Sequence, residues 1–255
     1  MIHPTAIVEK GAQLDEGVEI GAYAYIGPKV RLGKGTAIRH HATVEGNTEM
    51  GRNNVVFPYA FVGAMTQDLK FKGGQPGLKV GDNNCFREYC SIHVATEDGR
   101  FTVIGSYNNF LAYSHVAHDC ILGDHIITSN YCGVAGHVRI GNHVVMGGYA
   151  GVHQFCRIGD YAMLGGMAKV VQDVAPFVIV EGNPAKTRAL NKVGLERHNF
   201  DSDAMSQIKT AYKILFKSDL TREKAIEALR DENGEDSPFM AQMLAFVEQS
   251  ERGIC

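Results

Sequence analysis

The chain has 255 residues, of which 45% are hydrophobic and 21% are charged, a composition typical of folded domains and not of disordered segments. Its 29 glycines, 7 prolines and lack of tryptophan indicate frequent glycine turns and disfavour a mainly helical bundle. The formal charge is only −3, from 25 basic and 28 acidic residues, so no global field points to a nucleic acid or an anionic membrane as a partner.

Neither a membrane span nor a secretion signal is visible in the sequence. No apolar run approaches the roughly 18 to 20 residues that cross a bilayer. The first ten residues lack the basic region and the apolar region of a signal peptide. We therefore expect a cytoplasmic protein with no integral membrane association.

A six-residue repeat begins at Ile2 and runs through most of the chain. Every sixth residue from Ile2 to Val62 is large and apolar, and the same phase resumes at Val80 and again from Ile104 to Val170. Of the 30 positions in this series between residues 2 and 176, 25 are large and apolar, far more than the composition produces by chance. Four residues after most of the large positions stands a small or β-branched one, for example Ala6, Ala12, Val18, Ala24, Val30, Ala150, Ala162 and Ala168.

Such a short strand-turn unit cannot bury its apolar face alone, so successive units must coil and stack. Three six-residue units make a coil of 18 residues, and the sequence predicts an all-β solenoid, a parallel β-helix, over residues 1–184. Two interruptions, near residues 63–79 and 93–103, preserve the phase of the repeat. We interpret them as loops on a rigid scaffold, which is where functional residues commonly lie.

Beyond Pro184 the six-residue pattern stops, and residues 185–255 are expected to form a C-terminal α-helical domain. Asp201 or Ser202 can cap a helix that ends near Lys217, and Thr221 can cap a second that ends near Asp231. A third helix is expected to begin at Ser237-Pro238, with proline in its first turn.

The cysteines show no pattern of metal or redox chemistry. Four of the six fall at the small interior position of their six-residue units, namely Cys90, Cys120, Cys132 and Cys156. Cys85 and Cys255 have no partner at CxxC spacing, and cytosolic proteins rarely keep disulfides. We assign the four repeat cysteines to the core and none of the six to chemistry.

The histidines gather on one wall of the predicted β-helix. If a coil has 18 residues, four histidines fall at neighbouring positions on adjacent coils, and adjacent coils lie about 4.8 Å apart. None of the four belongs to the apolar series, so their side chains should point outward. They are His115, His118, His137 and His153. His125 and His143 stack with each other on a different part of the coil. Histidine beside Asp119 suits proton transfer near neutral pH, while converging imidazoles also suit zinc. The residues alone leave both chemistries open.

Several motifs in a fixed order resemble one family, the UDP-N-acetylglucosamine O-acyltransferases of lipid A synthesis. They are His115-Val116-Ala117-His118-Asp119-Cys120, Ala135-Gly136-His137-Val138, Val152-His153-Gln154-Phe155-Cys156 and Gln67-Asp68-Leu69-Lys70. The resemblance covers essentially the whole chain. It implies a left-handed parallel β-helix, an exception to the usual right-handed crossover, and a homotrimer with sites between subunits. It also implies an acyltransferase without metal or cofactor.

The resemblance also implies catalytic roles. His118 would be the general base that takes a proton from the sugar 3-hydroxyl, and Asp119 would orient it. The backbone N–H of Gly136 would stabilise the oxyanion that forms when the hydroxyl attacks the thioester of a (3R)-hydroxyacyl acyl carrier protein. Gly136 lies 18 residues after His118, one coil further on, so the spacing supports this pairing independently.

Further residues would bind the substrates. The resemblance places His115, His137, His153 and Gln154 on the sugar nucleotide. It places Asp68 on the sugar and Lys70 on the pyrophosphate or the donor, from a neighbouring subunit. The nucleotide and the carrier protein would contact Asn191 and Arg197, and the family often has a second arginine where this chain has His198. The resemblance places the end of the acyl groove at Gly165-Gly166-Met167: Gly166 at the stop would admit a longer hydroxyacyl chain, whereas an intruding Met167 would admit a shorter one.

The segment 185–217 carries seven basic residues against three acidic ones. Because the acyl donor would be an acidic carrier protein, we interpret this excess of basic residues as a docking surface for it. Complementary charge increases the rate at which two proteins associate.

Three other functions fit the sequence less well. An N-acyltransferase of the same superfamily would carry an additional N-terminal domain, whereas the repeat here begins at Ile2. A trimeric zinc hydratase of the γ-carbonic-anhydrase type would need two histidines five residues apart, which the chain lacks. A non-catalytic scaffold would leave the histidine wall unexplained. The acceptor could also be a 3-amino analogue of the sugar, which the sequence does not distinguish.

Overall fold

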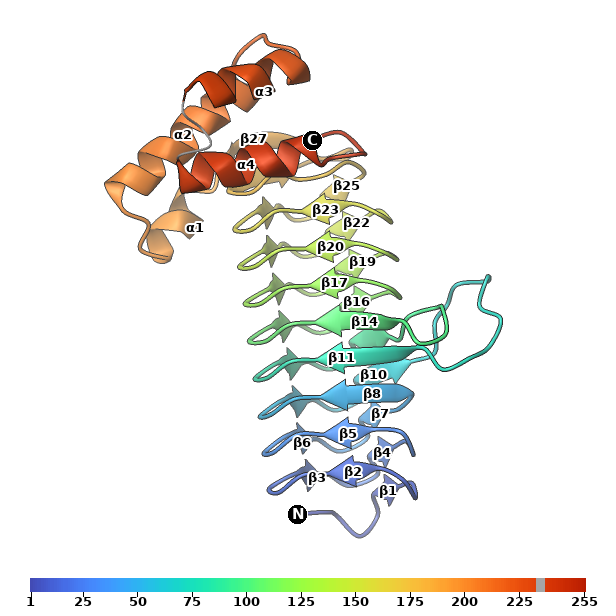
Figure 1. Cartoon of the computed structure of the whole chain (residues 1–255). Helices are drawn as coiled ribbons and strands as arrows, with labels where there is room; N and C mark the ends of the chain where they lie inside the picture. The colour runs from blue at the N-terminus through green and yellow to red at the C-terminus, as the bar shows by residue number, and fades with distance from the viewer. Residues whose placement is uncertain (233–236) are drawn as a thin grey trace.

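The computed structural model describes residues 1–232 and 237–255. Short strands coil into a three-sided prism that carries a cluster of helices at its C-terminal end (Figure 1). Each strand from β1 to β22 pairs in parallel with the strand three further along the chain, so that Ser91, His115 and Gly133 lie side by side. The predicted parallel β-helix is confirmed.

The three sides are three sheets. The first sheet contains β1 (Ile7–Val8), β4 (Tyr25–Ile26), β7 (Thr43–Val44), β10 (Phe61–Ala64), β13 (Ser91–His93), β16 (His115–Val116), β19 (Gly133–Val134), β22 (Gly151–Val152) and β25 (Lys169–Val170). The second contains β2 (Gln13–Leu14), β5 (Arg31–Leu32), β8 (Asn47–Met50), β11 (Gly77–Val80), β14 (Phe101–Ile104), β17 (Ile121–Leu122), β20 (Arg139–Ile140) and β23 (Arg157–Ile158). The third contains β3 (Glu19–Ile20), β6 (Ala37–Ile38), β9 (Val55–Val56), β12 (Cys85–Phe86), β15 (Asn109–Phe110), β18 (Ile127–Thr128), β21 (Val145–Met146), β24 (Met163–Leu164), β26 (Val178–Glu181) and β27 (Lys186–Leu190).

The coil is left-handed. In Figure 1 the strands of the second sheet, such as β2 and β5, face the viewer and run from right to left while the chain rises. A chain that moves this way along its near side as it climbs describes a left-handed helix. The hand implied by the resemblance is therefore the observed one.

The interior is built from the residues that the repeat predicted. Large side chains such as Ile26, Leu32 and Phe110 are at most 1% exposed. The four repeat cysteines are buried and free, as expected. Burial raises the pKa of the Cys120 thiol to about 12, so this thiol stays protonated and acts as a packing residue.

Aromatic side chains stack along the corner between the third and first sheets. The five tyrosines that form this tyrosine ladder are Tyr59, Tyr89, Tyr113, Tyr131 and Tyr149, each with a positive φ. Their ring centroids lie 4.7–5.2 Å apart, and their planes are nearly parallel. At the next corner His125 and His143 stack with centroids 4.6 Å apart, as the 18-residue period predicted.

Two long connections leave the prism on the same side (Figure 1). Residues 65–76 join β10 to β11, and residues 94–100 join β13 to β14. The strands on either side keep the register of the coil, since Leu78 still pairs with Thr48. Thr66 and Thr96, one from each connection, join them through hydroxyl groups 2.9 Å apart.

The segment after Pro184 does not turn helical at once. Gly182, at a φ of +102°, begins a turn that returns the chain as β27, antiparallel to β26. The helices follow as α1 (Lys192–Arg197), α2 (Ser202–Phe216), α3 (Arg222–Asp231) and α4 (Pro238–Glu248). Asp201 and Thr221 cap α2 and α3 as predicted.

The helices have their own apolar core, in which Leu195, Ile208 and Met243 pack against Phe177 at the end of the prism. No described helix is long and apolar enough to cross a membrane.

Candidate active site

The candidate site lies at the corner between the first and second sheets, on two consecutive coils. His118 and Asp119 form the turn that follows β16, and Gly136 and His137 occupy the same turn after β19. The two turns are joined because His137 N–H donates to the carbonyl of His118 over 3.1 Å. Stacking of identical turns thus brings together residues that are 18 positions apart.

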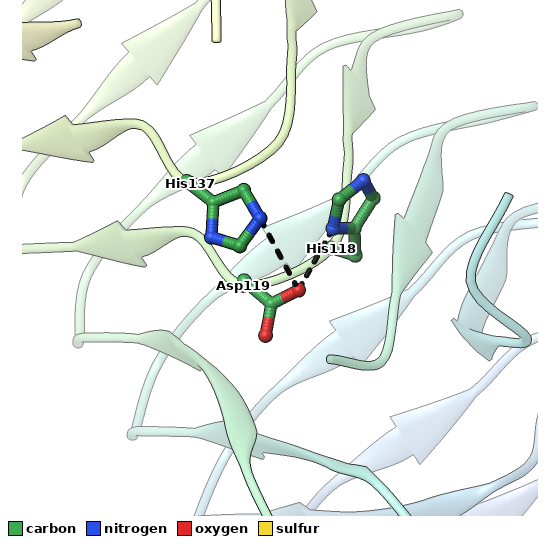
Figure 2. Close-up of side chains that lie close together, drawn as sticks. All are labelled: His118, Asp119 and His137. Atoms are coloured by element: carbon green, nitrogen blue, oxygen red, sulfur yellow. Dashed lines mark hydrogen bonds and ion pairs between the residues drawn. The ribbon is translucent and has the colours of Figure 1, made fainter. Parts of the chain in front are cut away.

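His118 and Asp119 form a hydrogen-bonded pair (Figure 2). His118 Nδ1 is 2.8 Å from Asp119 Oδ2, and both side chains are mostly buried. An ionised carboxylate can only accept, so Nδ1 carries the proton and the other nitrogen, Nε2, keeps its lone pair. This tautomer is the one that a general base requires.

The carboxylate of Asp119 is itself held in place. It accepts hydrogen bonds from the backbone N–H of Thr96, with N–O distances of 3.1 and 3.3 Å. The N–H of Asp119 donates to the hydroxyl of Thr102, a fully buried residue, over 2.9 Å. Neither residue was predicted: Thr96 lies in the 94–100 connection, which interrupts the repeat, and Thr102 lies in β14, directly after it.

Gly136 packs directly against the imidazole of His118. A Cβ atom at this position would lie 2.5 Å from His118 Cε1 and 2.7 Å from Nε2, closer than real atoms approach. Among the residues that the structure describes, its N–H has no hydrogen-bond partner. The glycine therefore leaves both room for the ring and a free backbone donor next to it.

His137 completes the wall around the pair. Its Nε2 is 3.9 Å from Asp119 Oδ2, and its ring lies edge-on to that of His118 with centroids 5.2 Å apart. The other side of the His137 ring stacks on Phe155, at 4.7 Å and 10°.

The 65–76 connection brings Asp68 over the site. Asp68 Oδ2 is 4.0 Å from His118 Nε2 of the same chain. The loop is held by local hydrogen bonds: Asp68 N–H donates to Thr66 Oγ1, and Thr66 is joined to Thr96 at the base of the loop. Lys70 remains exposed to solvent.

His115 lies on the outer face of the first sheet, in β16, three residues before His118. Its Nδ1 is 2.8 Å from Ser91 Oγ, and its ring lies edge-on to the buried His93. Burial, together with the neighbouring His93 and His118, lowers the pKa of His115 to about 4, so this imidazole is neutral at physiological pH. Ser91 and His93 were missed because the loop makes their spacing from His115 unequal to one coil.

A groove of about 500 Å³ runs along this face. His115 and His118 line one end, and Lys169 and Val170 line the other. Its middle is formed by Gly133 and Gly151, where an added Cβ would meet no atom within 4 Å. The glycines thus keep open a mostly apolar channel that leads away from His118.

His153 also borders the groove, while Gln154 is exposed at the neighbouring turn. His153 Nδ1 lies 3.1 Å from the carbonyl of Gln154 and 3.4 Å from Arg252 Nη2. Arg252, from the end of the chain, was not predicted at the site, since nothing in the repeat connects it with residue 153.

Comparisons with known proteins show which family the chain resembles. Residues 173–255 match the family model described as Udp N-acetylglucosamine O-acyltransferase, Domain 2. The acyl-(acyl-carrier-protein)-UDP-N-acetylglucosamine O-acyltransferases of Thermodesulfovibrio yellowstonii and Herminiimonas arsenicoxydans are 46% and 45% identical, over 100% of this chain and 98% of each relative. The chain belongs to the UDP-N-acetylglucosamine O-acyltransferase family.

Solved structures of the family have the same fold. The Moraxella catarrhalis member superposes with a TM-score of 0.95 at 41% identity, and the Acinetobacter baumannii member with 0.95 at 44%. Each comparison covers 99% of this chain and 98% of the other. The predicted family, the acyltransferase class and the left-handed β-helix with a C-terminal helical domain are all confirmed.

Three predicted residues lie away from this corner within the chain. Asn191 is buried at the start of α1, where its amide accepts from Gly194 N–H and donates to the carbonyl of Tyr161. Its polar atoms are therefore engaged in capping and docking α1. Arg197 is exposed in the last turn of α1. Gly166 is exposed at the corner between the third and first sheets, next to Met167.

His198, where the resemblance led us to expect a second arginine, contacts the prism of its own chain. Its ring lies edge-on to His143 at 4.6 Å and to Tyr161 at 5.2 Å. The residue thus helps to seat α1 on the corner between the second and third sheets.

Proposed function

We propose that the protein transfers a (3R)-3-hydroxyacyl chain from acyl carrier protein to the 3-hydroxyl of UDP-N-acetylglucosamine, the first step of lipid A synthesis. Family membership supports the reaction class, and the His118–Asp119 pair, with Nδ1 and Oδ2 2.8 Å apart, supports the mechanism. The acyl transfer is direct and uses no metal or cofactor.

His118 Nε2 takes the proton of the sugar 3-hydroxyl as its oxygen attacks the thioester carbonyl. The imidazolium that forms is stabilised by the carboxylate of Asp119. The tetrahedral intermediate then expels the thiolate, and His118 returns the proton to the sulfur. The products are the O-acylated sugar nucleotide and the free thiol of the carrier protein.

The developing oxyanion requires a donor placed before the reaction begins. The free N–H of Gly136 lies beside the ring that removes the proton, which supports its assignment as this donor. A preorganised donor of this kind contributes about 3 to 4 kcal/mol to the transition state.

The groove suits the remaining parts of the substrates. Its apolar walls at Gly133, Gly151 and Val170 accommodate an acyl chain, and His115 and His153 line it where polar groups of the sugar nucleotide can bind. Gln154, exposed at the turn next to His153, is assigned to the nucleotide as well. Asp68 and His137 flank the sugar. Lys169 lines the groove, and Lys70 is exposed on the 65–76 connection, so each offers positive charge for a phosphate.

The remaining assignments concern assembly. We infer a cytoplasmic homotrimer. In it, Asn191 and Arg197 contribute to binding the nucleotide and the carrier protein at an adjacent subunit, and Gly166 limits the length of the acyl chain. Arg197 is exposed and therefore accessible to a partner. For Asn191 the role is indirect, since its own side chain holds α1 in place.

Purified protein should be mixed with UDP-N-acetylglucosamine and a panel of 3-hydroxyacyl carrier proteins, with EDTA in a parallel reaction, and the acylated nucleotide followed by mass. We expect EDTA-resistant product with one preferred chain length. No product with any chain would contradict the acceptor and direct attention to the 3-amino sugar. Loss of product only in EDTA would contradict the metal-free mechanism.

The base is tested with His118→Ala, and His125→Ala is the matched control on another corner of the prism. Loss of the base should lower kcat by about 100-fold or more. The control should keep normal turnover. A His118→Ala enzyme that retains a tenth of the activity would exclude this histidine as the base.

A further inference from the structure

Two histidines and one carboxylate converge at the site in a geometry that fits a metal ion. His118, Asp119 and His137 each offer one ligand atom, and these atoms lie within 4.8 Å of one another. His118 Nδ1 is 2.8 Å and His137 Nε2 is 3.9 Å from Asp119 Oδ2. A tetrahedral zinc ion with bonds of about 2.0 to 2.1 Å places its ligand atoms roughly 3.3 Å apart, a value that lies between these two distances.

We propose that this cluster is an inhibitory binding site for a transition-metal dication of the zinc class, held by His118 Nδ1, Asp119 Oδ2 and His137 Nε2. Imidazole and carboxylate ligands suit such ions. Figure 2 shows the three side chains pointing toward one another from two consecutive coils. A water molecule would complete the tetrahedral shell.

The ligands are already oriented. The Asp119 carboxylate is fixed by the N–H of Thr96, and the His137 ring is fixed by its stack on Phe155. Outer contacts of this kind raise metal affinity, because the ion does not have to order its ligands.

A metal ion can reach the cluster through a cavity that is separate from the groove. Asp119 and His137 border a polar cavity of about 810 Å³ over the second sheet, together with Arg139 and Arg252. His118 borders the apolar groove on the first sheet instead. The cluster therefore lies between the two spaces, and an ion can reach it from the cavity without passing through the groove.

Metal binding and base catalysis exclude each other at His118. The general base carries its proton on Nδ1 and accepts at Nε2. When Nδ1 binds a metal, the neutral imidazole carries its single proton on Nε2, so the nitrogen that faces Asp68 and Gly136 no longer has a free lone pair. The inhibitory effect rests on the proposed function, whereas the binding itself does not.

Binding is tested on the full-length protein, freed of metal by a chelator, with Co²⁺ as a spectroscopic probe. We expect tetrahedral Co²⁺ absorption in the wild type, reversed by Zn²⁺. Affinity should fall by roughly tenfold or more in His137→Phe and in Asp119→Asn. Phenylalanine already occupies the equivalent corner one coil later, at Phe155 with φ +66°, so the first variant is compatible with the fold.

His125→Phe is the matched control, since His125 also has a positive φ and stacks in an aromatic column. It should bind Co²⁺ like the wild type. Equal affinity in wild type and His137→Phe, or no binding in either, would overturn the site.

The inhibitory effect is measured separately as the kcat of acyl transfer with Zn²⁺ and after EDTA. We expect Zn²⁺ to abolish turnover and EDTA to restore it. Zinc that binds without lowering kcat would overturn the inhibitory role. A metal-free enzyme that makes no product would contradict the proposed function but leave the Co²⁺ result unaffected.

Discussion

The imidazole of His118 faces two different surroundings with its two nitrogens. Nδ1 meets the carboxylate of Asp119 at 2.8 Å, while Nε2 faces Gly136 and, at 4.0 Å, the carboxylate of Asp68. The first contact fixes the tautomer, and the second side is where a substrate hydroxyl can approach. Small changes around this ring should therefore affect turnover far more than folding.

Gly136→Ala tests how closely the ring is confined. The new Cβ would lie 2.5 Å from His118 Cε1, so the imidazole must move. We expect kcat to fall by about 100-fold, since misplacement by an ångström costs this much. Gly148→Ala is the control, because its Cβ would meet only Asn130 O at 3.5 Å. The test is to measure kcat of both variants by steady-state kinetics. Equal kcat values for Gly136→Ala and Gly148→Ala would contradict the close packing of Gly136 against His118.

His115 predicts a pH dependence of stability. Its pKa is about 4 in the folded protein instead of the usual 6.5, so between these values the unfolded chain binds more protons. The stabilisation is complete above pH 6.5 and is lost as the pH falls toward 4. The Tm of the wild type should therefore decrease more steeply over this range than that of His115→Gln. If Tm falls equally with pH in the wild type and in His115→Gln, the lowered pKa of His115 is refuted.

At the scale of elements, the two long connections turn a uniform solenoid into a site. Thr66 and Thr96 join them, Asp68 reaches His118 from one, and Thr96 holds Asp119 from the other. The coils supply rigid positions and the loops supply contacts that no repeat unit contains.

The loop also provides a test of substrate binding. Lys70→Ala should raise the KM for the sugar nucleotide or the carrier protein by about tenfold and leave the Tm unchanged, because the side chain is exposed. Lys72→Ala, two residues away and also exposed, should behave like the wild type. If both variants bind substrate normally, Lys70 is an ordinary surface residue.

The repeat made much of the fold predictable from the sequence, whereas the long connections and β27 did not follow from it. Interior positions such as Ile26 and Cys120 repeat every six residues, so the prism and its cysteine packing were predictable. The 18-residue coil also predicted that His118 and Gly136 meet. Ser91 was not predictable, because the loop changes its spacing from His115. The mostly exposed β27 has no buried alternating face to mark it as a strand, and it forms only by pairing back onto β26.

At the scale of the whole molecule, stability comes from coil-to-coil contacts that repeat along one axis. Inside the prism, buried asparagines continue this ladder: Asn84 donates to Asn54 Oδ1 and Gly105 O, and its own Oδ1 accepts from Asn108 N–H. These bonds connect three consecutive coils through groups that are buried away from water.

Asn84→Leu should therefore destabilise the protein by about 2 to 4 kcal/mol, since it leaves buried backbone groups unpaired. Urea unfolding followed by circular dichroism measures the change. Asn109→Ala, at an exposed position of β15, should alter the free energy of unfolding by at most about 0.5 kcal/mol. Similar values for the two variants would show that the internal ladder contributes little.

The tyrosine ladder gives the molecule an optical signature. The chain contains no tryptophan, so its near-ultraviolet signal comes mainly from tyrosine. Five of the ten tyrosines stand in one column with nearly parallel rings 4.7–5.2 Å apart, close enough for their electronic transitions to couple. Near-ultraviolet circular dichroism therefore records the stacking of the coils themselves, and it allows the winding of the β-helix during refolding to be followed without an added label.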